Sequence, residues 1–501
     1  MDIMTVFSNV FQIDCLLLIL VGVIIGNIFG CIPGLNTPIA IALVLPFSMS
    51  LGQVQAVCLV MGIYMGGVSG GLITAILLKI PGTAASVATT FDGYPMAQKG
   101  EGTKALTLGA FSSFFGGIFS SVMLLLLAPI LSKMAIGFGP WEYFGTTVLA
   151  LSMVCLLGKG NYTKCFISLG IGLIVKTIGA SPVDGIAVRY SFGLLGLENG
   201  LNLVAVILGI FALPEIIFSA NKLKNKLEAK IDSKKFINIP SFKDMKFHFV
   251  NLLRSSTLGT FIGILPGLGG GPAGMMAYSI TKKTSKYPEE FGKGCPDGIV
   301  SAESANNATT GGALIPMLSL SVPGDTATAV IMGAFAIQGI AVGPNLSLLK
   351  PNLFGSIILA VFVANIFMFL YQATTLRYMS KILQVPRMYL LPIIVVFCVT
   401  GVYCLSNNVF DLYYTVILLV LGYVLDKNDY PIVPFIMAMV LGGSVEENLR
   451  RSITYYGSFV DCLKLPSFGT LFFFGAIIMV IIMVVLNSNV LKSKKMKEGL
   501  N

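Results

Sequence analysis

Gly259-Thr-Phe-Ile-Gly263-Ile-Leu-Pro266-Gly267-Leu268 is the stretch that decides how this chain is organised, because it has a counterpart near the chain start. Residues Gly26-Asn-Ile-Phe-Gly30-Cys-Ile-Pro33-Gly34-Leu35 repeat its spacing of glycines followed by Pro-Gly-Leu. Both stretches lie in apolar segments, where a Pro-Gly pair interrupts a helix. The pattern predicts two broken helices at corresponding places of an internal repeat.

The composition indicates a protein embedded in a membrane. Of the 501 residues, 55% are hydrophobic and only 11% are charged, and the mean hydropathy is +0.86. Apolar segments recur from about residue 15 to about residue 487, which leaves room for roughly ten to fourteen crossings or half-crossings at about 20 residues each. We therefore predict an all-α polytopic membrane protein.

The sequence gives little indication of a metal site or of nucleic-acid binding. Nine cysteines are scattered without a C-x-x-C pair, and the single histidine, His248, falls in a charged segment that we interpret as a loop. We predict no metal site and no cofactor. The net charge of +10 comes from basic residues beside apolar segments, which is typical of charge that sets membrane topology rather than of nucleic-acid binding.

A second pair of breaks follows the first in each half. Aligning Pro81 with Pro323 superposes Ile80-Pro-Gly-Thr83 on Val322-Pro-Gly-Asp325. Apolar runs such as Ile39 to Phe47 are too short to span, which favours half-helices or re-entrant hairpins at the breaks. Longer spans are predicted near 104–132, 143–158, 162–180, 200–220, 351–371, 388–405, 410–425, 431–443 and 468–487.

The charge pattern divides the chain and predicts its orientation. We assign 1–220 to a first membrane repeat, 221–250 to a basic cytoplasmic linker, 251–487 to a second repeat with additional spans, and 488–501 to a basic cytoplasmic tail. The start of the chain lacks lysine and arginine, which places it on the far side of the membrane. The two repeats are then inverted relative to each other, an arrangement that many secondary transporters use.

The breaks suit an anion. A helix that starts inside a membrane leaves its first N–H groups unpaired and carries the positive end of its dipole there. Hydroxyl and amide side chains follow each Pro-Gly pair and add neutral donors. Lys79 and Arg189 are possible cationic supplements, although snorkelling or a loop position explains them as well.

Other interpretations of the same residues stay open. Close helix packing accounts for any one Gly-Pro cluster, and less readily for four that repeat in order. Glu303, Asn306, Asn307 and Asp325 offer hard oxygen ligands for Na⁺, and a carboxylate could instead carry a coupling proton. Glu303 and Asp297 could also lie in an aqueous loop, which we favour for Asp297.

The same motifs carry a family resemblance. The chain resembles the large membrane subunit of the tripartite tricarboxylate transporters, the TctA type, over nearly its whole length. The motifs occur in the right order and are Pro33–Pro38, Ile80–Thr83, Ala88–Gly100, Leu265–Gly270, Ala305–Ala308 and Gly311–Pro316. Ala84 and Lys79 depart from the usual family pattern, which puts citrate itself in doubt as the substrate.

The resemblance implies a permease of the bacterial inner membrane for tricarboxylates or dicarboxylates, driven by a Na⁺ or proton gradient. Its expected partners are a small TctB-like membrane subunit and a periplasmic TctC-like solute-binding protein. Asn307 and Asp325 are possible ligands of the coupling ion. The candidate substrate-binding residues are Gly34, Asn36, Thr37, Gly82, Thr83, Ser86, Gly267, Gly269, Gly270, Asn306, Asn307, Thr309, Gly324, Asp325 and Thr326.

A secondary active transporter with alternating access, by elevator or rocking motion, is the leading functional hypothesis. An anion channel, or a permease for a different organic anion, is the alternative. An intramembrane enzyme is the third class, but no nucleophile and base pair is evident in an apolar segment. The sequence favours a transporter over an enzyme.

Overall fold

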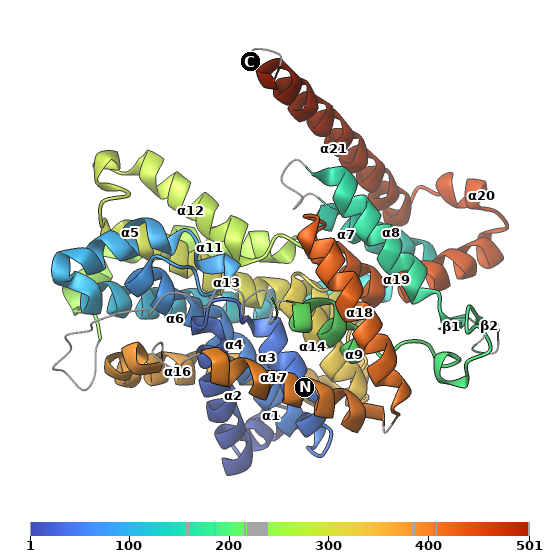
Figure 1. Cartoon of the computed structure of the whole chain (residues 1–501), viewed down its shortest axis with the longest axis horizontal. Coiled ribbons are helices and arrows are strands. Elements are labelled where there is room, and N and C mark those ends of the chain that lie inside the picture. Colours follow the sequence, from blue (N-terminus) through green and yellow to red (C-terminus); the bar gives the residue numbers. More distant parts are fainter. Residues whose placement is uncertain are drawn as a thin grey trace. The chain divides into compact units, whose positions relative to one another are not determined.

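The computed structural model describes residues 2–155, 161–183, 185, 187–214, 217, 239–382, 387–406 and 408–498 (Figure 1). Helices make up almost all of the secondary structure in these ranges. The chain divides into two compact units. The first unit contains residues 1–132 and 215–405, and the second contains residues 133–214 and 406–501. Most of the predicted linker lies outside the described residues.

The first unit contains all four predicted breaks. In chain order its elements are α1 Ile3–Val10, α2 Ile13–Cys31, α3 Thr37–Ser48, α4 Gln53–Leu78, the 3₁₀ turn η1 Ala84–Ser86, α5 Thr89–Met96, the π turn η2 Ala97–Glu101, α6 Gly102–Ile136 (whose last turn belongs to the second unit), α11 Phe242–Ile264, α12 Gly270–Thr284, the 3₁₀ turn η6 Pro288–Glu290, α13 Pro296–Leu320, α14 Thr326–Ile337, α15 Pro344–Leu349, α16 Pro351–Ile382 and α17 Arg387–Ser406.

The second unit packs around a single tryptophan. Trp141 is fully buried against Phe144, Phe459 and Phe473, and its indole N–H donates to the Thr470 hydroxyl at 3.0 Å. The elements of this unit are α7 Pro140–Cys155, α8 Tyr162–Lys176, the antiparallel pair β1 Gly179–Ala180 and β2 Val188–Arg189, the 3₁₀ turn η4 Leu195–Leu197, α9 Leu203–Ile207, the π turn η5 Leu208–Ala212, α18 Phe410–Lys427, α19 Ile432–Tyr456, α20 Phe459–Leu463 and α21 Phe468–Glu498.

The apolar helices confirm an all-α polytopic membrane fold. Among the described residues, six helices are long and apolar enough to cross a membrane. They are Ile13–Cys31, Gln53–Leu78, Thr89–Ile136, Pro351–Thr375, Ile432–Tyr456 and Phe468–Val485. Two shorter apolar helices, α3 and α14, follow a break in each half, as the interrupted pattern predicts.

The two halves of the sequence build the same helix pair. Helix α2 packs on α4 so closely that a Cβ on Gly26 would collide with the Ile63 carbonyl, and α11 packs on α13 so that a Cβ on Gly259 would collide with the Ala305 carbonyl. Glycine permits this close approach of helix backbones. The pairs α2–α4 and α11–α13 are therefore structural counterparts, and the orientation of the two halves across a membrane stays a prediction.

Corresponding elements also make reciprocal contacts between the halves. Helix α12 of the later half contacts η1 of the earlier half, and α3 of the earlier half contacts α14 of the later one. Each half thus places the helix after its first break against the second break of the other half. This exchange brings the predicted site residues together within the first unit.

Two expectations about loops are wrong. His248 lies in helix α11 with 7% of its surface exposed, and its Nδ1 is 2.9 Å from the Asp297 carboxylate. Asp297 stands in the first turn of α13 and also accepts a hydrogen bond from Asn251 at 2.8 Å. The helix continues through a charged stretch because its inner face finds these polar partners.

Candidate functional site

The first break of each half ends a helix in the same conformation. Gly34 has φ of +91° and Gly267 has φ of +86°, and both stand between a Pro and the helix that follows. Positive φ is readily adopted by glycine alone, so the Pro-Gly pair both stops the incoming helix and turns the chain. The break places Asn36 as the N-cap of α3, where its Oδ1 accepts from the Ile39 N–H at 3.2 Å.

The second breaks correspond residue by residue. Lys79 follows the last residue of α4 as its C-cap, and Ser321 is the C-cap of α13. These aligned positions both adopt a left-handed conformation. Beyond them Gly82 lies against Gly30, and Gly324 lies against Gly263, so close that a Cβ on either glycine would collide with backbone. The four predicted breaks are thus present, and their glycines lie where helices approach each other.

The same turn follows both second breaks. The Thr83 N–H donates to the Ser86 hydroxyl at 3.3 Å, and the Asp325 N–H donates to the Thr328 hydroxyl at 2.9 Å. The Ser86 hydroxyl then donates to the Thr83 carbonyl, and the Thr328 hydroxyl to the Asp325 carbonyl. Thr83 and Asp325 are therefore structural equivalents that differ in charge.

Asp325 is part of a complete hydrogen-bond network, which we call the closed junction (Tyr64, Asp325 and Thr328). Its Oδ1 caps α14 by accepting from the Thr328 N–H at 2.7 Å and the Thr328 hydroxyl at 2.8 Å. Its Oδ2 accepts from the buried Tyr64 hydroxyl of α4 at 3.1 Å. A carboxylate at this position is thus held by donors from both halves.

The equivalent place in the other half, which we call the open junction (Thr83, Gly270 and Asn306), has no such hydrogen-bond network in the described part of the chain. Asn306 of α13 aligns with Tyr64 of α4 and is fully buried. Among the described residues, neither its Nδ2 nor its Oδ1 has a partner in hydrogen-bond geometry, although the side chain interacts with the Glu303 carboxyl of the same helix. The buried Thr83 hydroxyl, which lies against Gly71 of α4, also has no hydrogen-bond partner in the described ranges. Buried polar groups left in this way are uncommon and costly, by about 1–3 kcal/mol each.

The start of α12 forms one side of the open junction. A Cβ on Gly270 would collide with the Asn306 Oδ1 and would lie 3.0 Å from the Ala85 Cβ of η1. Gly269 precedes it with φ of +61°, and a Cβ there would lie 3.6 Å from the Asp325 Cβ. The helix start, with N–H groups that have no acceptor inside the helix, therefore lies beside both junctions.

The remaining candidates lie in or beside these junctions. The Thr309 hydroxyl donates to the Asn306 carbonyl at 2.6 Å, and the Gly267 N–H donates to the Gly324 carbonyl at 2.7 Å. Thr37 and Thr326 are the first residues of α3 and α14, and Thr37 packs against Gly67 of α4. Every predicted substrate-binding residue thus belongs to the first unit.

Asn307 does not join Asp325, its fellow candidate ion ligand. Its Nδ2 donates to the Ser113 hydroxyl of α6 at 2.8 Å and to the Glu303 carbonyl at 3.2 Å. The amide therefore belongs to a separate polar cluster around Glu303. The two possible coupling-ion ligands lie in different networks.

The two cationic supplements have other partners. The Lys79 Nζ lies 5.8 Å from the centre of the Tyr94 ring, and the Lys79 side chain is exposed. Arg189 pairs with Glu446 of the second unit through two contacts of 2.7 and 3.1 Å. These contacts favour the structural interpretation of both side chains.

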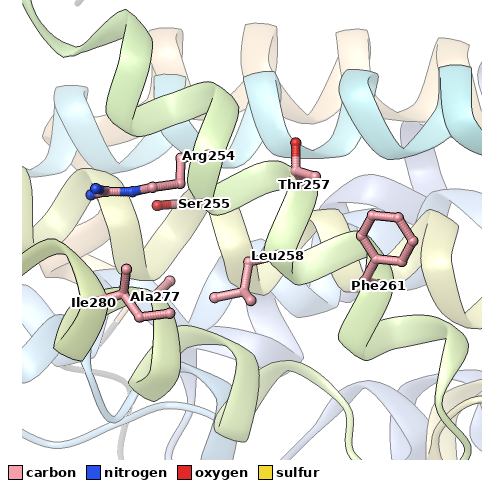
Figure 2. A pocket seen from close by; sticks show the side chains of 7 residues that line it. All are labelled: Arg254, Ser255, Thr257, Leu258, Phe261, Ala277 and Ile280. Carbon is pink, nitrogen blue, oxygen red and sulfur yellow. The ribbon is translucent and has the colours of Figure 1, made fainter.

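A hollow of about 220 Å³ lies between α11 and α12, and Figure 2 shows the side chains that surround it. It is mostly apolar, with Arg254 at one side, and that guanidinium donates to the Thr281 and Thr284 hydroxyls. None of the candidate residues is among those that line this hollow, which are Arg254, Ser255, Thr257, Leu258, Phe261, Ala277 and Ile280. We therefore place the candidate site at the junctions.

Sequence reasoning missed Asp92, which joins the two halves. This fully buried carboxylate on α5 accepts from the N–H groups of Gly292, Gly294 and Cys295, each at 2.8 Å, and from the Tyr278 hydroxyl at 2.9 Å. Its three N–H donors hold the loop before α13 against α5, and the tyrosine adds a contact from α12. The glycines around residue 292 were the one signal in the sequence, since successive N–H groups in such a loop can surround an anion.

The chain is similar in sequence to known proteins. The model of the tripartite tricarboxylate transporter TctA family matches residues 16–437. An uncharacterized 52.8 kDa protein in the TAR-I ttuC' 3'region of Agrobacterium vitis is 35% identical over 434 residues, which cover 86% of each chain. An uncharacterized protein in the TAR-II ttuC' 3'region of the same organism is 38% identical over 195 residues, 39% of this chain and 81% of that one. No solved structure matches.

Proposed function

Because this chain belongs to the tripartite tricarboxylate transporter TctA family, we propose that it is the permease subunit of a secondary active transporter for organic carboxylates and binds its substrate at the open junction. The family makes the chain the membrane component of a tricarboxylate transporter. The substrate class, the coupling and the binding position are parts of the proposal.

The unpaired amide of Asn306 is the observation that carries the binding position. It is fully buried, and among the described residues its Nδ2 has no acceptor in hydrogen-bond geometry, although its side chain interacts with the Glu303 carboxyl of the same helix. The Thr83 hydroxyl is a second buried donor of this kind, and the α12 start adds backbone N–H groups. Neutral donors of this kind suit a carboxylate without burying a cationic side chain.

The closed junction supports the choice of a carboxylate. At the equivalent place of the other half, the fold already surrounds the Asp325 carboxylate with hydroxyl and backbone donors. Thr83 supplies no such group. A carboxylate from the substrate would therefore occupy the open junction as the Asp325 side chain occupies the closed one.

The wider transport system follows from the family. We propose a small TctB-like membrane subunit and a periplasmic TctC-like binding protein as partners, a location in the bacterial inner membrane, and a Na⁺ or proton gradient as the driving force. The paired breaks support alternating access between two inverted repeats. In alternating access, the substrate would be released when the site opens to the opposite side of the membrane.

Counterflow of labelled citrate and succinate tests this function. Proteoliposomes that hold the full chain and its two partners should exchange at least one of these probes saturably, and linear flux or absent flux would refute transport by this mechanism. Asn306→Ala should raise the half-saturating concentration about tenfold, the effect of losing roughly one hydrogen bond. Asn428→Ala, which removes an exposed amide, is the matched control and should behave as wild type.

A further inference from the structure

A buried carboxyl group outside the two junctions has a set of neutral partners. Glu303 of α13 is fully buried, and its Oε1 accepts from the Thr89 hydroxyl of α5. Its Oε2 accepts from the Ser113 hydroxyl of α6 at 3.0 Å and from the Asn307 Nδ2 at 3.5 Å. An ionisable group inside an apolar helix bundle is costly unless it serves a function.

The fold does not need polar residues at these positions. In the alignment of Pro81 with Pro323, Glu303 corresponds to Met61 and Thr89 corresponds to Ile331. Both Met61 and Ile331 are fully buried, so the other half fills the same places with apolar side chains. The polar cluster therefore belongs to one half only and is not part of the shared scaffold.

The charged groups near α13 lie elsewhere along the helix. Asp92 of α5 and Tyr278 of α12 bond each other beside Gly298, and His248 of α11 bonds Asp297 in the first turn of α13. Arg254 of α11 donates to Thr281 and Thr284 of α12. No ion pair with Glu303 occurs among the described residues.

We propose that Glu303 is the coupling site and that it binds and releases one proton in each transport cycle. This rests on the proposed function, because it assigns the coupling cation of the same transporter. Asn306 follows Glu303 by three residues, so the two side chains lie on one face of α13. When the substrate carboxylate binds, a proton adds to one carboxylate oxygen of Glu303 and converts the side chain to a carboxylic acid. The proton leaves as the substrate is released.

The orientation of Asn307 favours a proton over a sodium ion. Its Nδ2 is fixed by the Glu303 carbonyl and the Ser113 hydroxyl, so the amide turns N–H groups, not its oxygen, toward the carboxyl. A sodium ion needs several oxygen ligands that are free to face it, whereas the Thr89 and Ser113 hydroxyls already donate to the two Glu303 oxygens. A proton needs one carboxylate oxygen, and the hydroxyl and amide donors can stabilise the carboxylate that remains after its release.

Proteoliposomes with the full chain and its partners separate coupling from transport, with labelled citrate and succinate as probes. Wild type should accumulate the probe that it exchanges when a pH gradient is imposed. Glu303→Gln should retain exchange and lose gradient-driven accumulation, and Glu303→Asp, which keeps a titratable group, should retain part of it. Glu101→Gln, a change at an exposed acidic residue, should match wild type in both assays.

The results distinguish the two proposals. Absent exchange in wild type would contradict the transport function itself. Normal exchange together with undiminished accumulation in Glu303→Gln would overturn the coupling role. Accumulation that requires a Na⁺ gradient at equal pH, or loss of exchange in a Glu303→Gln chain that still elutes as a folded protein, would overturn the proton assignment as well.

Discussion

The closed and open junctions occupy equivalent places of the repeat but differ in the hydrogen bonds that their polar side chains make. In the closed junction, Tyr64 and Asp325 bond each other, and Asp325 also caps the following helix. In the open junction, their equivalents Asn306 and Thr83 have buried polar atoms that meet no hydrogen-bond partner in the part of the chain that the structure describes. The same backbone turn thus carries a complete hydrogen-bond network in one half and no matching network in the described residues of the other half.

We interpret this difference between the junctions as a structural role for the closed junction and a binding role for the open junction. Glycine packing and left-handed helix ends recur in both halves, so they belong to the scaffold. The side chains at the junctions do not recur. When two repeats share a backbone but differ in their polar residues, one repeat can use these residues to stabilise the fold. The other repeat can use them to bind a ligand.

Removal of the Asp325 carboxylate from the closed junction should have the largest effect on the free energy of unfolding. Asp325→Ala deletes a helix cap and leaves the Tyr64 hydroxyl buried without its acceptor, so we expect a loss of about 3 kcal/mol in the free energy of unfolding. Thermal or denaturant unfolding of the purified chain measures it. Asp2→Ala, which removes an exposed cap of α1, is the matched control and should change little. An equal change in both variants would contradict a structural role of the closed junction.

A smaller loss of stability is expected from a change at Tyr64, which donates to Asp325 in the closed junction. Tyr64→Phe keeps the ring and removes one donor to Asp325, whose Thr328 bonds remain. We expect a loss of about 1 kcal/mol in the same unfolding measurement. A loss larger than that of Asp325→Ala would show that the tyrosine, and not the carboxylate, organises this junction.

The sequence predicted the breaks well because their signals are local. Pro-Gly pairs, aligned between halves, end helices where expected, and Gly34 and Gly267 adopt matching conformations. The fold class followed from apolar segments of spanning length. These features depend on neighbours along the chain.

The partners of the site residues could not be predicted in the same way. Tyr64 is separated from Asp325 by 261 positions, and Glu303 is separated from Thr89 by 214. Which face of a helix meets which neighbour is set by packing between the halves, and a single sequence gives no signal for it. For the same reason a loop position was wrongly preferred for Asp297, whose partners His248 and Asn251 come from another helix.

Ligand-induced stabilisation of the Thr83→Asp chain tests the central claim most directly. This substitution places a carboxylate in the open junction, where Asp325 has one in the closed junction, while Thr83→Asn supplies a neutral side chain of similar size. The unfolding temperature of the purified full chain is measured with increasing citrate and succinate. We predict that wild type and Thr83→Asn are stabilised by a bound carboxylate and that Thr83→Asp no longer responds. A Thr83→Asp chain that responds as strongly as wild type would contradict binding at the open junction.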